Sequence, residues 1–457
     1  MSTETCETCN TYNLLKLTRG LFAVEPDAGK MDFYERALYN HILASQEPQT
    51  GMFVYLMSLK PGHFKTYSTP EDSFWCCVGT GMENHSKYGD TIYFQGADSL
   101  YVNLFIASEL SWKAKGMSVR QETTFPESDQ TRLTFKCDKP VPLTLKIRRP
   151  AWAQSPLTIR VNGRKQDLRG EPGSYLALNR EWRDRDKVEI QLPMTLHTEA
   201  LPAVSNIVAL LYGPIVLAGE LGTNVMPVPF ARGQTDFSNL PVPIEPVFVC
   251  AARKVSAHVA PVSGRRLTFR TRGIGRPNDV TLIPLYQLHR QRYSVYWKLL
   301  SESDWRAQTA ELAAAETRRV TAEARLVDAV RPGEQQSETD HHFQGGDTQS
   351  GSFDGRKWRH ATDWFSYEVK VLPDQPLQLV CTFWGSDKGS REFDVVVDGK
   401  IIATQKLNNI KPGEFFDAMY PVPTEFTRGK ETITVKFAAH SGNLAGGLFG
   451  LRVVRGK

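Results

Sequence analysis

The chain has 457 residues, which is enough for two to four domains with sizeable hydrophobic cores. Its 55 basic and 50 acidic residues leave a net charge of +5, and because no long basic run is present, the composition argues against nucleic acid as a partner. Seven cysteines are an odd number, so a fully paired disulfide framework is excluded, and no apolar run reaches the ~18 residues of a membrane span.

Two amphipathic helices are predicted near the start of the chain, over residues 10–22 and 32–45. The face expected to point inward in the first helix comprises Leu14, Leu17, Leu21 and Phe22. In the second helix it comprises Phe33, Tyr34, Ala37, Leu38, His41 and Ile42. Residues 52–59 form a short apolar run closed by a Pro-Gly pair, which indicates a strand or a hairpin.

Two adjacent cysteines, Cys76 and Cys77, lie between two aromatic residues and a glycine-rich turn. Thr80 and Glu83 have the spacing of a helix capping box, so we expect the thiols in an irregular loop just before a short helix. Unpaired N–H groups and the helix dipole favour a thiolate at such a place. The pair by itself leaves three interpretations open: two buried thiols, a strained vicinal disulfide, or two ligands of one metal ion.

A second group of cysteines, near the start of the chain, favours the metal interpretation. Two Glu-Thr-Cys triplets follow each other, one with Glu4 and Cys6 and one with Glu7 and Cys9. We favour Glu7 and Cys9 because they lead directly into the first helix, whereas the other triplet lies on a terminus that can fray. With the paired cysteines they supply three thiolates and one carboxylate, a complete tetrahedral shell for zinc. The other cysteines are interpreted as buried, reduced thiols in strand-like runs: Cys137, Cys250 and Cys381.

After residue 88 the hydrophobic pattern changes from helical to alternating. Short alternating runs with turn signals between them, such as Asn162-Gly163, are typical of all-β domains. They predict an antiparallel β-sandwich over residues 96–300.

The remaining residues predict a connection and a second β domain. Residues 301–345 are expected to form a solvated helix, over 304–329, and the start of a polar, glycine-rich linker that extends to residue 352. The alternating pattern then returns, with a turn signal at Asp398-Gly399. A second sandwich, of jelly-roll type, is therefore predicted over 346–457.

Three segments resemble a known enzyme family. They are Glu-Thr-Cys-Asn-Thr-Tyr-Asn-Leu-Leu-Lys-Leu-Thr-Arg at 7–19, Phe-Tyr-Glu-Arg-Ala-Leu-Tyr-Asn at 33–40 and Ser-Phe-Trp-Cys-Cys-Val-Gly-Thr-Gly at 73–81. Together they closely resemble glycoside hydrolase families 127 and 146, the β-L-arabinofuranosidase-like proteins. The β-rich remainder resembles the accessory domains of the same family, and its last sandwich would be a carbohydrate-binding-like domain.

The resemblance implies a six-hairpin α/α barrel, a zinc ion held by one Glu and three Cys, and a retaining mechanism. Carried over to this chain, the zinc ligands would be Glu7, Cys9, Cys76 and Cys77, with Cys76 as the catalytic nucleophile. Glu35 and Tyr55 would contact the sugar, by looser matches. For Glu35 the alternative is a helix-pairing carboxylate, and for Tyr55 it is a core aromatic residue.

The chain also departs from the family pattern. A six-hairpin barrel consists of paired helices, and this sequence offers two long helices before its β region. In the family, most of the barrel and the general acid/base Glu precede the Glu-x-Cys motif. We therefore expect residues 1–95 to be the C-terminal remnant of the barrel, in a chain that is inactive alone, with the acid upstream of Met1 and the missing half possibly a separate chain.

The sequence thus predicts a zinc-dependent retaining glycosidase that acts on L-arabinofuranose-containing plant glycans. The parent protein is expected in the periplasm or outside the cell. An alternative hypothesis is a non-catalytic carbohydrate-binding or scaffold protein with a structural zinc site. A third, thiol redox chemistry at Cys76 and Cys77, is less favoured because redox sites typically use Cys-x-x-Cys.

Overall fold

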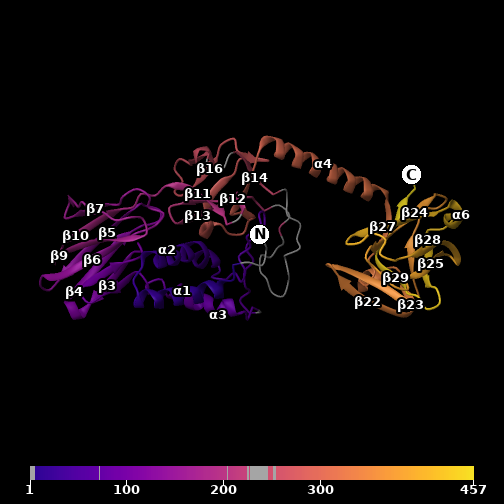
Figure 1. Cartoon of the computed structure of the whole chain (residues 1–457), viewed down its shortest axis with the longest axis horizontal. Helices are drawn as coiled ribbons and strands as arrows, with labels where there is room; N and C mark the ends of the chain where they lie inside the picture. The colour runs from indigo at the N-terminus through magenta and orange to yellow at the C-terminus, as the bar shows by residue number, and fades with distance from the viewer. Residues whose placement is uncertain are drawn as a thin grey trace. The chain divides into compact units, whose positions relative to one another are not determined.

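The computed structural model describes residues 6–71, 73–202, 204–223, 226, 245–250 and 254–456 (Figure 1). The chain divides into two compact units, Met1–Ala307 and Gln308–Lys457, each with its own hydrophobic core. Among the described residues, no helix is both long and apolar enough to cross a membrane.

The first unit opens with three helices that lie side by side: α1 (Thr8–Val24), α2 (Ala28–Ala37) and α3 (Cys76–Ser86). Asp27 caps α2 by accepting a hydrogen bond from the Lys30 N–H. The helical path continues beyond α2 through a π-helical turn (Leu38–Ile42) and a 3₁₀ turn (Leu43–Ser45). The two predicted helices are therefore present, and both are longer than expected.

The buried face of α1 differs from the predicted one. Leu14, Leu17 and Leu21 are 42%, 57% and 48% exposed, whereas Phe22 is buried as expected, together with Leu15, against residues of α2 and its continuation. In the second helix, Phe33 is 42% exposed, while Tyr34, Leu38 and Ile42 are buried as expected. The correction has a simple cause: α1 is apolar on two faces, and the face that α2 and the following strands cover is the one that carries Leu15 and Phe22.

The described residues of 46–75 form loops in place of the predicted strand or hairpin at 52–59. Isolated antiparallel bridges fix their path, joining Gln46 to Phe53, Val54 to Tyr67, and Glu7 to Leu56. The last bridge brings the segment before α3 next to the start of α1.

Residues 93–191, described without a gap, form a β-sandwich of a four-stranded and a six-stranded sheet that share one core. The four-stranded sheet has the order β1 (Tyr93–Gln95), β2 (Ser99–Val102), β6 (Val141–Arg149), β9 (Ser174–Trp182). The six-stranded sheet has the order β3 (Ser108–Trp112), β4 (Met117–Thr123), β5 (Gln130–Cys137), β10 (Lys187–Gln191), β7 (Thr158–Val161), β8 (Arg164–Lys165). The predicted turn at Asn162-Gly163 joins β7 to β8, with φ of 50° and 81°.

The described part of residues 196–300 forms a separate ten-stranded sheet. Its strands are β11 (Leu196–Leu201), β12 (Val204–Tyr212), β13 (Ile215–Glu220), β14 (Val247–Val249), β15 (Val259–Pro261), β16 (Phe269–Thr271), β17 (Gly275–Arg276), β18 (Thr281–Pro284), β19 (Tyr293–Ser294) and β20 (Tyr296–Leu300). Its two faces contribute to two cores, one of which includes residues of the loop segment before α3. The single sandwich expected over 96–300 is thus two sheet assemblies that part near residue 192.

The connecting helix is present as α4 (Glu302–Arg325), but it ends earlier than predicted. The next residues form β21 (Leu326–Val330), which pairs with the last strand of the second unit. The expected linker at 331–352 contains α5 (Gln335–Asp340) and most of β22 (Gln344–Phe353), so it is part of the folded unit. The residues of β22 are polar and pair through their backbone, so the sequence shows no hydrophobic alternation there. For this reason the segment resembled a linker.

The strands of the second unit, whose residues 326–456 are all described, belong to one nine-stranded sheet folded around a single core. Besides β21 and β22 they are β23 (Arg356–Lys370), β24 (Leu377–Trp384), β25 (Glu392–Val397), β26 (Lys400–Lys406), β27 (Phe415–Val422), β28 (Thr432–Ala439) and β29 (Ala445–Arg455), with the short helix α6 (Thr424–Thr427) between β27 and β28. The predicted turn at Asp398-Gly399 joins β25 to β26.

Candidate active site

The starts of α1 and α3 bring the two cysteine motifs together. Glu7 is the N-cap residue of α1 and Cys9 lies in its first turn, while Cys76 and Cys77 are the first two residues of α3. The ligand atoms of these four side chains all lie within 4.8 Å of one another. Glu4, the competing carboxylate, lies outside the described residues.

The environment of α3 corrects the predicted capping box. The helix begins at Cys76, after Trp75, so the thiols lie in its first turn and not in a loop before it. Thr80 is inside the helix and its hydroxyl donates back to the Cys76 carbonyl, while Glu83 accepts a 2.5 Å hydrogen bond from the Tyr12 hydroxyl. The first N–H groups of a helix have no partner within it, so both thiols sit where the backbone favours negative charge.

The distances between the sulfur atoms show whether the cysteines are bonded to one another. The Cys9 Sγ atom lies 3.3 Å from Cys77 Sγ, and Cys76 Sγ lies 4.0 Å from Cys77 Sγ and 3.7 Å from a carboxylate oxygen of Glu7. A disulfide has its sulfurs about 2.05 Å apart, so the adjacent cysteines are separate thiols and not a vicinal disulfide.

The thiols differ in their access to solvent. Cys9 and Cys77 are buried, while Cys76 is exposed and Glu7 is half-buried. Burial raises the pKa of Cys9, and it raises the pKa of Cys77 to about 12. A nearby cation is therefore needed to hold these two side chains as thiolates at neutral pH, and Cys76 is the thiol that a substrate can reach.

Tyr55 lies beside the cluster. Its backbone carbonyl accepts hydrogen bonds from the Thr8 N–H and the Cys77 thiol, and its ring contacts Trp75 at 5.7 Å between centroids. The negative charge of Cys76, followed by that of Glu7, raises the pKa of the Tyr55 hydroxyl. The phenol is therefore close to the exposed thiol.

Glu35 lies in a different environment. It is 1% exposed and accepts hydrogen bonds from Arg148 at 2.5 Å and from the Trp152 indole at 2.9 Å. Arg148, which is fully buried, also pairs with Asp32. Burial raises the pKa of Glu35, and the Arg148 charge opposes that shift. These contacts join α2 to β6, and the predicted contact between Glu35 and a sugar stays a prediction.

Family models match four consecutive regions of the chain. Residues 1–90 match the model described as β-L-arabinofuranosidase, GH127 catalytic domain, and residues 99–194 match the GH127 middle domain. Glycoside hydrolase family 127 is therefore the family of these two regions, which lie within residues 1–194. Residues 197–299 match a domain of unknown function (DUF4986), and residues 321–454 match a family of unknown function (DUF6805).

Solved structures of glycoside hydrolases have a similar fold. A β-L-arabinofuranosidase from Geobacillus stearothermophilus T6 matches with a TM-score of 0.51 and 22% identity, over 65% of this chain and 51% of that one. A structure described as a glycoside hydrolase matches with a TM-score of 0.50 and 20% identity, over 65% of this chain and 53% of that one. This chain thus spans about half the length of the structures it matches. No curated protein sequence matches it.

The boundaries of the family matches agree with the sheets of the structure. The GH127 middle domain ends at residue 194, and the sandwich of β1–β10 ends at Gln191. The next matched region, 197–299, is the ten-stranded sheet. The four-residue cluster belongs wholly to the catalytic-domain match.

Proposed function

We propose that this chain carries the zinc site and the nucleophile of a retaining β-L-arabinofuranosidase-like glycoside hydrolase, acting on glycans that contain L-arabinofuranose. One observation supports it most strongly: three thiols and a carboxylate from two helix starts converge within 4.8 Å, and one of the thiols is exposed. The helices before the β region are proposed to be a remnant of an α/α barrel.

The donor set fits zinc. Zinc binds thiolates and carboxylates, and Zn–S bonds of about 2.3 Å at tetrahedral angles place ligand atoms about 3.8 Å apart. The separations here are 3.3, 3.7 and 4.0 Å. Glu7, Cys9, Cys76 and Cys77 would hold the ion. When bound, zinc lowers the pKa of its thiol ligands and keeps them ionised at neutral pH.

Cys76 is proposed to act as the nucleophile. Its sulfur attacks the anomeric carbon of the arabinofuranose, the bond to the leaving oxygen breaks, and a general acid protonates that oxygen. Water, which gives a proton back to the conjugate base of that acid, then attacks the same carbon, the C–S bond breaks and the thiolate returns, so two inversions give net retention. Tyr55 and Trp75, beside Cys76, are proposed to contact the sugar.

The exposure of Cys76 favours catalysis over a structural zinc site. Structural sites are closed by their four ligands, and in this cluster Cys9 and Cys77 are buried as that role requires. Cys76 has no such cover. The carbohydrate-binding alternative with a purely structural zinc would have no use for a solvent-accessible thiolate.

The general acid is proposed to lie in the part of the catalytic domain that this chain does not cover. The matched structures extend over about twice the aligned length, since 51% of the first is covered. General acid–base catalysis typically contributes ~10²–10⁴-fold. The chain alone is therefore expected to hydrolyse glycosides slower by about that factor than the chain joined to the missing half.

The test measures arabinose released from an aryl β-L-arabinofuranoside by the joined protein, with NMR to read the anomeric configuration of the first product. Retention is expected, and Cys76→Ser should lower kcat by on the order of 10³-fold or more while the fold persists. Cys6→Ser, in the competing triplet, is the matched control and should stay active. Inversion, or full activity in Cys76→Ser, would contradict the proposed nucleophile.

A further inference from the structure

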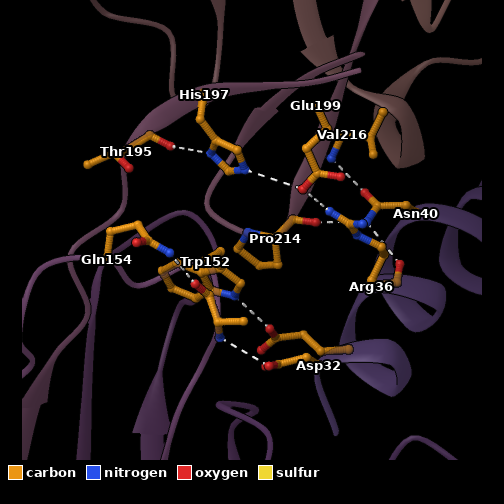
Figure 2. A network of polar contacts seen from close by, with 12 residues as sticks. Asp32, Arg36, Asn40, Trp152, Gln154, Thr195, His197, Glu199, Pro214 and Val216 are labelled. Carbon is orange, nitrogen blue, oxygen red and sulfur yellow. Dashed lines mark hydrogen bonds and ion pairs between the residues drawn. The ribbon is translucent and has the colours of Figure 1, made fainter. Parts of the chain in front are cut away.

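A second site is formed by a pocket where α2, the loop after β6 and β11 meet within the first unit. Its volume is about 470 Å³, inside the range of about 300–1,000 Å³ that is usual for small-ligand sites. The side chains used below are Phe33, Arg36, Trp152, Gln154, His197 and Glu199. None of the four residues of the thiol cluster lines it. Figure 2 labels Arg36 of α2, Trp152 and Gln154 of the loop after β6, and His197 and Glu199 of β11.

The walls of the pocket are held in place by hydrogen bonds. The Trp152 indole donates to Glu35, and the Ala151 N–H donates to Asp32 at 3.0 Å. On the opposite side, the Asn40 side chain donates to the Pro214 carbonyl at 2.8 Å and accepts from the Val216 N–H at 2.7 Å (Figure 2). A ligand would therefore meet a site that is already ordered, which reduces the entropy lost on binding.

A chain of polar groups crosses the pocket. Arg36 pairs with Glu199, Glu199 lies 3.7 Å from His197, and the His197 ring contacts the Thr195 carbonyl (Figure 2). The nearby His197 ring, and then Arg36, lower the pKa of Glu199 to about 2, so its carboxylate stays charged. A guanidinium has five hydrogen-bond donors and a carboxylate about four acceptor sites. After pairing with each other, Arg36 and Glu199 therefore still have donors and acceptors that can bind a ligand.

Aromatic surface lies next to these polar groups. Phe33 is 42% exposed on α2, which the prediction of an inward-facing Phe33 did not anticipate. Trp152 is half-buried, and its indole stacks on Phe125 at 6.3 Å. Apolar rings beside paired charges suit a ligand with both apolar C–H faces and hydroxyl groups.

The ion pairs of the pocket wall narrow the ligand class. Arg36 is paired with Glu199, and Asp32 is paired with the buried Arg148, so the charged groups that line the pocket already have partners. An anionic or cationic ligand would have to compete with these partners. A neutral sugar would not, since its hydroxyls can both donate to a carboxylate and accept from a guanidinium.

We propose that this pocket binds a neutral saccharide unit, with Phe33 and Trp152 contacting the ring, and Arg36, Glu199 and Gln154 hydrogen-bonding to its hydroxyls. Only the choice of L-arabinose as the first probe rests on the proposed function.

The test is ligand-observed NMR with methyl L-arabinofuranosides, D-galactose and D-xylose on the wild-type chain and on variants. Phe33→Ala and Gln154→Ala change exposed side chains, so both should fold, which circular dichroism would verify. At least one sugar should bind the wild type, and Phe33→Ala should weaken it about fivefold, the loss of roughly one aromatic contact. Leu17→Ala, an exposed apolar side chain on α1, is the matched control and should bind as the wild type does.

The outcomes separate this site from the thiol cluster. Binding that survives in Cys76→Ser but weakens in Phe33→Ala supports the pocket, whatever the fate of the zinc proposal. Binding lost in Cys76→Ser and unchanged in both pocket variants would place the sugar at the thiols and overturn the pocket, leaving the proposed function intact. Absence of binding by the wild type to every sugar in the panel would also overturn it.

Discussion

Cys76 and Cys77 are neighbours in the sequence, yet one is exposed and the other is fully buried. Successive residues of a helix point about 100° apart, so the first turn of α3 directs one thiol to solvent and the other towards Cys9 and the Tyr55 carbonyl. This difference gives two chemically similar residues separate proposed roles, one as nucleophile and one as a buried ligand.

Arg148 forms ion pairs with two carboxylates, those of Glu35 and Asp32. Among the described residues, no other cation forms an ion pair with either. The Arg148 side chain is 0% exposed. Arg148→Met should lower the free energy of unfolding by about 3–5 kcal/mol, because removing one partner leaves buried charge uncompensated. Urea denaturation of the variant and the wild type measures this difference in the free energy of unfolding. Arg36→Met, which breaks an ion pair whose side chains are 48% and 42% exposed, should cost about 0–1 kcal/mol.

The Arg148→Met variant should also respond to pH. Burial raises the pKa of Glu35, and the variant loses the charge that opposes this. A carboxyl with a higher pKa in the folded state contributes stability below its unfolded pKa and loses it as pH rises through the folded pKa. The stability lost relative to the wild type should therefore be smaller near pH 5 than near pH 8. An equal loss at both pH values would show that Glu35 is not the group left uncompensated.

The two residue-scale networks differ in how far the sequence could predict them. The thiol cluster could be predicted because each half is a short local motif, Glu-x-Cys or Cys-Cys. The partner of Glu35 could not, because Arg148 lies 113 residues away. Its only local signal is a pair of arginines, Arg148 and Arg149, at the end of a strand with alternating apolar residues.

At the scale of elements, α3 packs tightly on the loop segment before it. A Cβ atom at Gly81 would lie 2.8 Å from the Phe53 ring, whereas one at Gly79, on the same helix, would meet nothing within 4 Å. Gly81→Ala should lower the free energy of unfolding by about 1–3 kcal/mol through overpacking. Thermal unfolding of the zinc-free and zinc-loaded chain would measure it.

Gly79→Ala is the matched control. With open space around it, an alanine should raise stability by roughly 0.5–1 kcal/mol, because glycine is unfavourable inside a helix. If both variants had the same effect, the contact between α3 and Phe53 would not be part of the fold.

Helix faces show what a hydrophobic pattern leaves undetermined. In α1, Leu14, Leu17 and Leu21 share one face, and Leu15 and Phe22 share another. Periodicity predicts the helix, but the choice of buried face depends on where α2 and the strands around Ile92 and Leu104 pack. That information is non-local, so the sequence pattern alone could not supply it.

At the scale of the whole molecule, the second unit is expected to fold alone only with its first strands. β21 pairs with β29, and Glu338 of α5 holds Arg359 and the Tyr367 hydroxyl. Residues 308–457 should show a cooperative thermal transition, while 346–457 should melt at a lower temperature or fail to fold, because it lacks β21 and α5. Equal melting temperatures would show that these elements add nothing to the unit.

Domain boundaries were the least predictable part of the fold. The number and type of short strands indicated β domains, yet the division near residue 192 and the polar strand β22 left no signal in hydrophobic alternation. The division near residue 192 depends on distant pairing, such as that of β12 with β20. β22 pairs with the next strand, β23, but through the backbone of polar residues, so its sequence shows no hydrophobic alternation.

The central claim is that Glu7, Cys9, Cys76 and Cys77 form one zinc site, and metal content tests it most directly. Reduced, folded protein equilibrated with zinc and then desalted should carry one zinc per chain, by elemental analysis. Cys77→Ser should lose most of it, because metal affinity depends on the full set of deprotonated ligands, whereas Cys6→Ser should keep it. Folded wild-type protein without zinc, or Cys77→Ser with a full equivalent, would contradict the account.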